Sequence, residues 1–135
     1  MHVMTTEAVA RFLDRFTDWA AAQPHIQAAA LVGSHARGSA SSTSDVDLVI
    51  LADDPERFLA DRAWLATFGT PIAESREEYG GLTSLRVHFP GFLEVEFGLT
   101  TIRWAHVPVD PGTLDVISGG MRILFEPVRI LSSLV

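Results

Sequence analysis

The sequence contains no cysteine, which excludes disulfide bonds and metal sites built on thiolates. This composition suits a reducing compartment, so we expect a cytoplasmic protein. The sequence also lacks any window of about eighteen uninterrupted apolar residues, and no segment is predicted to cross a membrane. Charged side chains interrupt the apolar pattern near the N-terminus, which therefore does not resemble a signal peptide.

Positive charge is scarce as well. Lys and Arg together number 10 against 17 Asp and Glu, which gives a formal net charge of −7 and a pI near 5.0. Non-specific binding to nucleic acid needs a basic face, so nucleic acid is not an expected partner. A small anionic ligand held by a few local donors and a metal ion remains compatible with this charge balance.

The chain does have enough apolar side chains for one core. Its 135 residues are the size of one compact domain, and we expect residues 1–135 to form a single domain. Hydrophobic residues make up 47% of the sequence and include eight Phe and three Trp. Disorder is not expected on this composition.

The apolar pattern changes from helical spacing to strand alternation along the chain. A helix is predicted from Thr5 to Ala22, with Thr5 or Thr6 as N-cap and Pro24 beyond its end. The other expected elements are strands at 26–32 and 45–51, a helix from the cap Asp54 to Gly69, an edge strand at 71–79, a hairpin of 83–89 and 92–100, a helix capped by Asp110 and ending at Gly119, and an extended segment at 121–127. This order predicts an α/β (α+β) fold with a single mixed β-sheet flanked by helices.

Two aspartates, Asp45 and Asp47, interrupt the second predicted strand, "DVDLVIL". Side chains at positions i and i+2 of a strand point to the same face, about 6.5–7 Å apart. Two carboxylates this close repel each other unless a proton, a cation or water relieves them. Such a pair alone more often marks a solvated strand face, but Mg²⁺ is also held by one or two carboxylates together with phosphate oxygens. The pair therefore indicates half of a metal site.

The loop before this strand, "GSHARGSASSTS", offers donors for the same anionic ligand. Gly33 allows a sharp turn and a close approach of the backbone to an anion. A helical turn that begins at Ser34 would present free N–H groups beside the Ser34 hydroxyl, and Arg37 adds a cation. Ser44 either contacts the ligand or turns the chain into the strand. The loop is not a Walker loop, because Ser39 and Ala40 stand where Lys and Ser/Thr are required.

The stretch "GSHARGSASSTSDVDL" resembles the signature of the polymerase-β-type nucleotidyltransferase superfamily, a Gly-Ser pair followed by a polar linker and Asp-x-Asp. The variant with Ala-Arg-Gly after the pair is similar to the aminoglycoside adenylyltransferase and minimal nucleotidyltransferase branches. The resemblance implies that Ser34 and its neighbours hold the triphosphate of ATP or another NTP. It also implies that Asp45 and Asp47 ligate two Mg²⁺ ions. The signature covers about sixteen residues, and the predicted elements agree with it through roughly the first seventy.

This superfamily requires a third carboxylate on a neighbouring strand. The segment "FLEVEFGLT" supplies Glu94 and Glu96 on one face of the predicted hairpin. We favour Glu96, since its setting between Val95 and Phe97 best resembles the third strand of the superfamily, and Glu94 would then support it or contact the substrate. By the resemblance, Glu96 is a general base or a metal ligand. A glutamate where most relatives carry aspartate is a departure from the pattern.

The resemblance implies nucleotidyl transfer, in which an acceptor oxygen attacks the α-phosphate of ATP or another NTP and pyrophosphate leaves. The acceptor, a hydroxyl of a small molecule or a protein, is left open. Antibiotic-modifying relatives add a helical domain for which the segment after residue 109 is too short. The acceptor would then be bound by the hairpin and last helix, where Trp104 is a candidate lining residue, by a second copy in a homodimer, or by another protein. The alternative function is an antitoxin-type interaction module for a small helical partner of the HEPN type, with a secondary or inactive nucleotide site.

Overall fold

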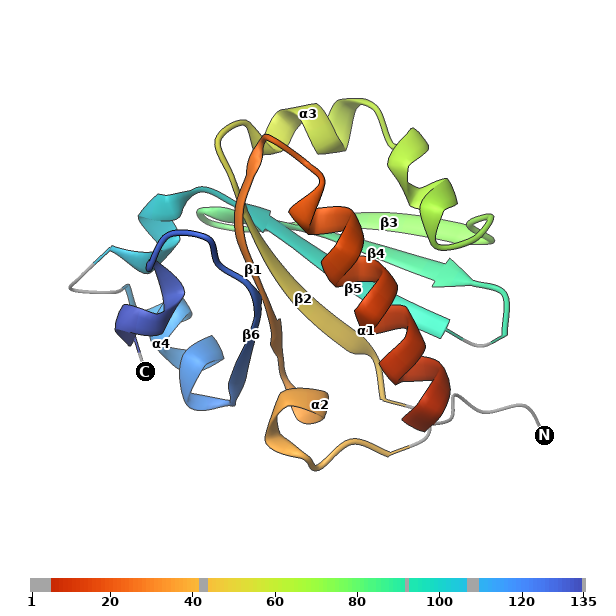
Figure 1. Ribbon diagram of the computed structural model, residues 1–135, viewed down its shortest axis with the longest axis horizontal. Coiled ribbons are helices and arrows are strands. Elements are labelled where there is room, and N and C mark those ends of the chain that lie inside the picture. Colours follow the sequence, from red (N-terminus) through yellow and green to blue (C-terminus); the bar gives the residue numbers. More distant parts are fainter. Residues whose placement is uncertain (1–5, 42–43, 92, 107–109, 135) are drawn as a thin grey trace.

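A computed structural model describes residues 6–41, 44–91, 93–106 and 110–134. Six strands form one sheet in the order β3-β4-β5-β2-β1-β6 (Figure 1). The strands are β1 Ile26–Val32, β2 Val46–Ala52, β3 Ala73–Tyr79, β4 Leu82–Phe89, β5 Leu93–Thr100 and β6 Met121–Phe125. Neighbouring strands are antiparallel except β2 and β5, which run parallel. The predicted single mixed sheet is confirmed.

Helices lie on both faces of this sheet (Figure 1). They are α1 Thr6–Ala21, α2 Ser34–Arg37, α3 Pro55–Ala60 and α4 Pro111–Ser118, with 3₁₀ turns η1 Ala63–Thr67, η2 Ile102–Ala105 and η3 Leu131–Leu134. The helices α1 and α3 and the turn η1 pack on one face, whereas α4, η2 and η3 pack on the other. Within the described residues, no helix is both long enough and apolar enough to traverse a bilayer.

The larger core lies between α1 and the sheet. The apolar stripe of α1 places Phe12, Phe16 and Trp19 against the sheet, and Phe16 is fully buried. The rings of Phe16 and Phe97 lie 6.4 Å apart, and that of Trp64 lies 5.0 Å from Phe97. Because side chains alternate along a strand, the residues of β2 and β5 that fill this core leave their neighbours on the opposite face.

That opposite face carries a smaller core over only part of its area. Val32 and Val49 of the sheet pack with Trp104 of η2 and Leu131 of η3, all of them buried. This core holds η2, η3 and α4 against β1 and β2. Asp47 of β2 and Glu94 and Glu96 of β5 alternate with residues of the larger core, so they lie on this opposite face, and they are not part of the smaller core.

The predicted elements agree with the structure except in the segment after β2. The single helix predicted from Asp54 to Gly69 is wrong, because the chain forms the short helix α3 and then η1. Asp61 between them has an extended backbone, with φ −119° and ψ 109°, and its Oδ1 accepts a hydrogen bond of 3.0 Å from the Ala63 N–H. A short polar side chain that bonds to the backbone two residues later favours a turn over a continuing helix.

The two aspartates predicted as helix caps differ in the structure. Asp110 accepts a 2.8 Å hydrogen bond from the Thr113 N–H and caps α4, as predicted. Asp54 precedes α3 but makes no side-chain cap hydrogen bond. The predicted cap Thr5 of α1 lies outside the described residues.

Candidate active site

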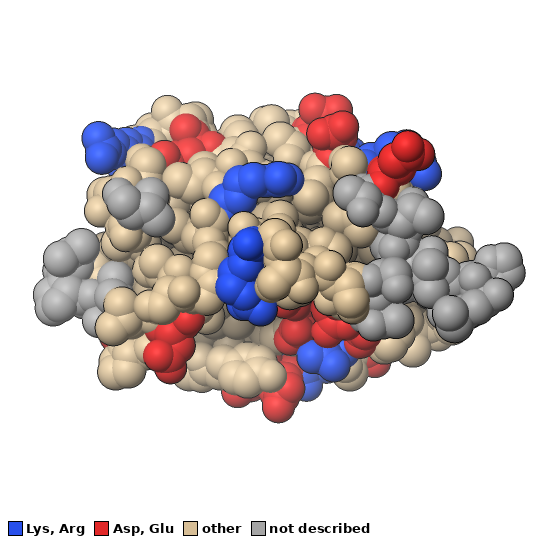
Figure 2. Space-filling model, turned by 90° about the horizontal axis from the view of Figure 1, so that it is seen from below, with Lys and Arg blue, Asp and Glu red and all other residues tan. Residues whose placement is uncertain are grey.

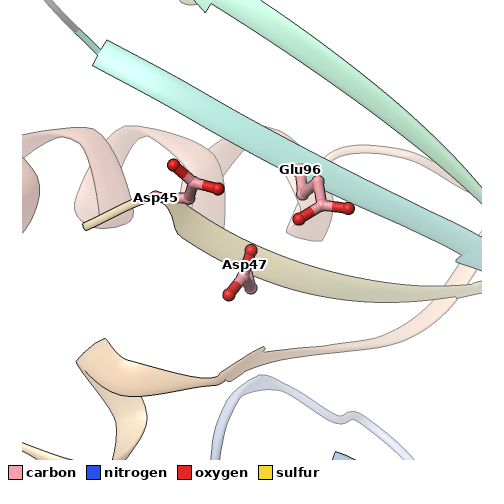
Figure 3. Close-up of side chains that lie close together, drawn as sticks. All are labelled: Asp45, Asp47 and Glu96. Carbon is pink, nitrogen blue, oxygen red and sulfur yellow. The ribbon is translucent and has the colours of Figure 1, made fainter. Parts of the chain in front are cut away.

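Three carboxylates converge on the sheet face opposite α1. Asp45 immediately precedes β2, Asp47 lies within it, and the parallel register places Asp47 opposite Glu96 of β5. One carboxylate oxygen from each residue lies within 4.8 Å of the other two. The side chains point toward one another across the gap between the two strands (Figure 3). The structure therefore brings together the three residues that the sequence analysis chose as catalytic and metal-binding.

The surroundings of Asp47 change the pKa of its carboxylate. Burial, a hydrogen bond shared with Glu96, and the charges of Glu96 and Asp45 raise its pKa from 3.8 to about 7, against the lowering effect of Arg86. Its Oδ1 is buried and has no hydrogen-bond partner among the described residues. A buried acceptor without a partner costs about 1–3 kcal/mol, and a bound cation would remove that cost.

The backbone of Gly33 lies close to the Asp47 carboxylate. Its backbone has φ 76° and ψ −155°, a combination that essentially only glycine adopts. A Cβ at this position would lie 2.5 Å from Asp47 Oδ2. The sequence analysis assigned Gly33 to a sharp turn, and the structure adds a second requirement, the absence of a side chain beside Asp47.

Glu96 is held in place by two residues of β4. The Ser84 hydroxyl donates a 2.8 Å hydrogen bond to Glu96 Oε1, and Arg86 Nη2 lies 3.2 Å from Glu96 Oε2. These contacts orient the Glu96 carboxylate toward Asp47. Ser84 and Arg86 were not identified in the sequence, although the alternation of "TSLRVHF" places them on one strand face.

Glu94 faces a different set of groups. Hydrogen bonding to Asp45, followed by burial and the Asp45 charge, raises the pKa of Glu94. Its Oε1 lies 3.1 Å from His88 Nε2 and 3.6 Å from Arg86 Nη1. Arg86 thus bridges the two glutamates. Acidic and basic side chains lie next to one another on the face of the molecule that Figure 2 shows.

The residues predicted to bind the phosphates occupy the loop between β1 and β2. The predicted helical turn is present, since α2 begins at Ser34. Arg37 Nη1 donates a 2.9 Å hydrogen bond to the Gly119 carbonyl, so Arg37 also ties α2 to the end of α4. The Ser44 hydroxyl accepts a 2.9 Å hydrogen bond from the Ser41 N–H, which fits the role of turning the chain into β2.

A pocket of about 800 Å³ opens beside the carboxylates, between the sheet and α4. Asp47 and Glu96 line one part of it, and Trp104 and Thr113 line another. Gly33 and Arg37 belong to the lining, whereas Ser34 and Ser44 lie outside it as far as the described residues define the pocket. The arrangement offers a place for a ligand of nucleotide size next to a cluster of hard oxygen ligands.

A mixed sheet with Asp45 just before β2, Asp47 within it and Glu96 on the neighbouring strand, behind a Gly-Ser turn, is the arrangement that the sequence analysis predicted for a nucleotidyltransferase. Residues 6–88, more than half of the chain, match the family described as streptomycin adenylyltransferase. The chain belongs to this family, and the predicted superfamily and its adenylyltransferase-like branch are thereby confirmed.

Among solved structures, the chain is similar to an aminoglycoside 6-adenyltransferase from Bacillus subtilis, with a TM-score of 0.58 and 21% identity. The likeness covers 82% of this chain and 38% of that one, so this chain spans well under half the length of its structural neighbour. At this identity the likeness shows the fold. No curated protein matches the chain.

Proposed function

We propose that this chain transfers an adenylyl group from ATP to an acceptor hydroxyl, with Mg²⁺ held by Asp45, Asp47 and Glu96. The observation that carries the proposal is the convergence of three carboxylates on Asp47, whose buried Oδ1 has no partner among the described residues. Family membership supports nucleotidyl transfer as the reaction class.

The carboxylates fit the proposed metal. All three offer hard oxygen donors, which Mg²⁺ prefers, and their mutual repulsion is relieved by a cation. When bound, Mg²⁺ neutralises charge on the phosphates and lowers the pKa of the attacking hydroxyl. The two ions expected from the superfamily would share these ligands and the phosphate oxygens.

The remaining residues of the site position the reactants. Ser84 and Arg86 hold Glu96, which either completes the metal site or accepts the proton of the acceptor hydroxyl. Gly33 keeps the loop close to Asp47, where a phosphate can approach the backbone. Arg37 lies at the wall of the same pocket with its charge available to the triphosphate. Fixed charges of this kind supply most of the catalysis in phosphoryl transfer.

The acceptor we propose is a hydroxylated small molecule, as the names of the family and of the structural neighbour suggest. We expect the acceptor to be bound beside the carboxylates by the β4–β5 hairpin and α4, by a second copy, or by another protein. Neither the described site nor the comparisons favour the alternative of an antitoxin-type module for a helical partner.

Calorimetric titration of ATP with and without Mg²⁺ tests the proposal. The native protein should bind ATP only with Mg²⁺, and the Asp45→Asn/Asp47→Asn variant should lose this binding. Asp18→Asn, which changes an exposed aspartate of α1, is the matched control and should bind as the native protein does. Absence of Mg²⁺-dependent binding in the native protein would refute the proposal. After binding is established, transfer of the label from α-labelled ATP to one compound in a panel of aminoglycosides identifies the acceptor.

A further inference from the structure

The turn between α4 and β6, formed by Gly119 and Gly120, lies beside α2 (Figure 1). A Cβ on Gly120 would lie 2.7 Å from Arg37 Cγ, 3.2 Å from the Arg37 backbone nitrogen and 3.4 Å from Arg37 Cα. These atoms belong to the main chain or lie close to it, so they cannot move aside as the end of a long side chain does. The absence of a side chain at Gly120 therefore allows α2 to lie where it does.

The guanidinium of Arg37 makes a second contact with the same turn. Arg37 Nη1 donates a 2.9 Å hydrogen bond to the carbonyl of Gly119, the C-cap residue of α4. A positive charge is favoured at this end of a helix, where the last carbonyls have no partner within the helix. The turn thus fixes Arg37 in two places, at the main chain through Gly120 and at the end of the side chain through Gly119.

These contacts continue from Arg37 to the carboxylates. The Arg37 N–H donates a 3.1 Å hydrogen bond to the Gly33 carbonyl at the other end of α2. The backbone of Gly33 in turn lies so close to Asp47 that a Cβ there would be 2.5 Å from Asp47 Oδ2. Gly120, the single turn of α2 and the Asp47 carboxylate therefore form a continuous series of contacts, and a shift of α2 changes the space between Gly33 and Asp47.

We infer that Gly120 is a positioning residue of the nucleotide site, which sets through Arg37 how close the Gly33 loop lies to Asp47. The inference rests on the proposed function, in which this loop holds the phosphates. Gly33, Arg37 and Asp47 line the pocket, whereas Gly120 lies outside the lining that the described residues form. Gly120 therefore acts on the nucleotide through its contact with Arg37.

Calorimetric titration of MgATP in a double-mutant cycle tests the inference. Gly120→Ala should weaken binding about tenfold in the native background, because the new Cβ displaces Arg37. In an Arg37→Ala background the Cγ that this Cβ would meet is absent, and the same substitution should weaken binding by less than about threefold. Gly80→Ala, where φ is also positive at 65° and a Cβ would meet nothing within 4 Å, should bind MgATP like the native protein.

A second variant and a second measurement do not depend on an alanine at positive φ or on the nucleotide. Gly119→Ala has an ordinary φ of −77°, and its Cβ would lie 3.4 Å from Arg37 Nη1. It should weaken MgATP binding about twofold to threefold in the native background and leave it unchanged in the Arg37→Ala background. In ¹H–¹⁵N spectra of the ligand-free protein, Gly120→Ala should shift the amide signals of Gly33 and Ser34, and Gly80→Ala should leave them in place.

Three results would overturn the inference while the proposed function stands. An equal loss of MgATP affinity from Gly120→Ala in the two backgrounds would show that Gly120 does not act through Arg37. Unchanged affinity in Gly120→Ala would show that the turn only ends α4. Unchanged Gly33 and Ser34 signals would show that the turn does not position the loop. If the native protein does not bind MgATP at all, the proposed function fails and the inference fails with it.

Discussion

At the scale of single residues, Asp47 predicts how the stability of the metal-free protein depends on pH. Its pKa is raised from 3.8 to about 7 by burial and by Glu96 and Asp45, so the folded state holds a proton that the unfolded state has released between these values. The free energy of unfolding contributed by Asp47 therefore falls as pH rises from about 4 to 7 and is constant above. Mg²⁺ competes with this proton, and its affinity should rise over the same range.

Urea unfolding of the native protein and of Asp47→Asn in EDTA measures this contribution. The variant lacks the titrating group, so its stability relative to the native protein should increase from pH 4 to pH 7 and then level off. Other titrating residues, Glu94 included, are shared by both proteins and largely cancel in the difference. A difference that does not change with pH would contradict the assignment of the raised pKa to Asp47.

Gly33 and Gly38 form a matched pair for a second residue-scale prediction. Both have positive φ, 76° and 77°, but a Cβ on Gly33 would meet Asp47 Oδ2 at 2.5 Å, whereas a Cβ on Gly38 would meet nothing within 4 Å. We expect Gly38→Ala to cost about 1 kcal/mol, the ordinary penalty of a left-handed residue. Gly33→Ala should cost more, about 2–4 kcal/mol, because it adds a forbidden ψ and a close contact.

Denaturant unfolding of the two alanine variants gives their stabilities, and titration with MgATP gives the effect on the site. Gly38→Ala should bind MgATP as the native protein does once it is folded. Gly33→Ala should bind it weakly, since the new side chain displaces the Asp47 carboxylate. Equal costs in stability for the two variants would show that the contact with Asp47 is not what requires a glycine.

The sequence was sufficient to predict that Asp45, Asp47 and Glu96 lie close together, because strand alternation and a known signature indicate which side chains share a face. The sequence was not sufficient to predict that Ser84 and Arg86 contact Glu96. Their contacts with Glu96 depend on the register between β4 and β5, in which Arg86 pairs with Glu96. Register across a hairpin is set by packing of the buried face as a whole, which no local pattern of residues reports.

At the scale of secondary-structure elements, two Asp-Pro sequences each predict a side-chain N-cap, but only one of the two aspartates forms it. Asp110 accepts a hydrogen bond from the Thr113 N–H, and Asp54 makes no side-chain cap hydrogen bond. Asp110→Ala should therefore lower the free energy of unfolding by about 1 kcal/mol, the usual value of an N-cap. Asp54→Ala should change it by less than about 0.5 kcal/mol, as expected of an exposed site without such a contact.

Thermal or urea unfolding of both variants measures the caps directly. Asp110→Ala should also weaken MgATP binding, because the cap holds the first turn of α4, which lines the pocket beside the carboxylates. Asp54→Ala, on the opposite face of the sheet, should not. A stability loss in Asp54→Ala as large as that in Asp110→Ala would contradict the geometry of the two helix starts.

The segment that follows β2 shows where a sequence pattern fails to predict an element. The apolar residues between Asp54 and Gly69 have helical spacing, yet the helix α3 ends at Ala60. Trp64 Nε1 donates a 2.9 Å hydrogen bond to the Phe58 carbonyl, and Asp61 bonds to the Ala63 N–H. Both bonds use groups that a continuous helix would employ differently. Periodicity reports which side chains are buried, but not the competition among hydrogen bonds that ends a helix.

At the scale of the whole molecule, the single mixed sheet followed from the order of the elements, but the strand order did not. The parallel pairing of β2 with β5 joins segments about fifty residues apart, and it is this pairing that sets Asp47 opposite Glu96. Long-range pairing depends on the fit of both faces, including the small core under η2 and η3. The resemblance to a known superfamily supplied what local patterns lacked.

Nucleotide binding in the pocket beside Asp47 should stabilise the whole fold, because residues of the sheet and of α4 line that pocket together. A ligand at a hundred times its Kd adds about 2.7 kcal/mol to the free energy of unfolding. For a chain of this size this corresponds to a rise in Tm of roughly 10 °C. Mg²⁺ alone should raise Tm less, and ATP with EDTA should leave it unchanged.

Differential scanning calorimetry at constant ionic strength separates this linkage from general salt effects. The Asp45→Asn/Asp47→Asn variant should show no rise with MgATP, whereas Asp18→Asn should show the native rise. Thr113→Val on its own should be at least as stable as the native protein, since it removes a buried hydroxyl that has no partner among the described residues. A native rise in the double variant would place nucleotide binding away from the carboxylates.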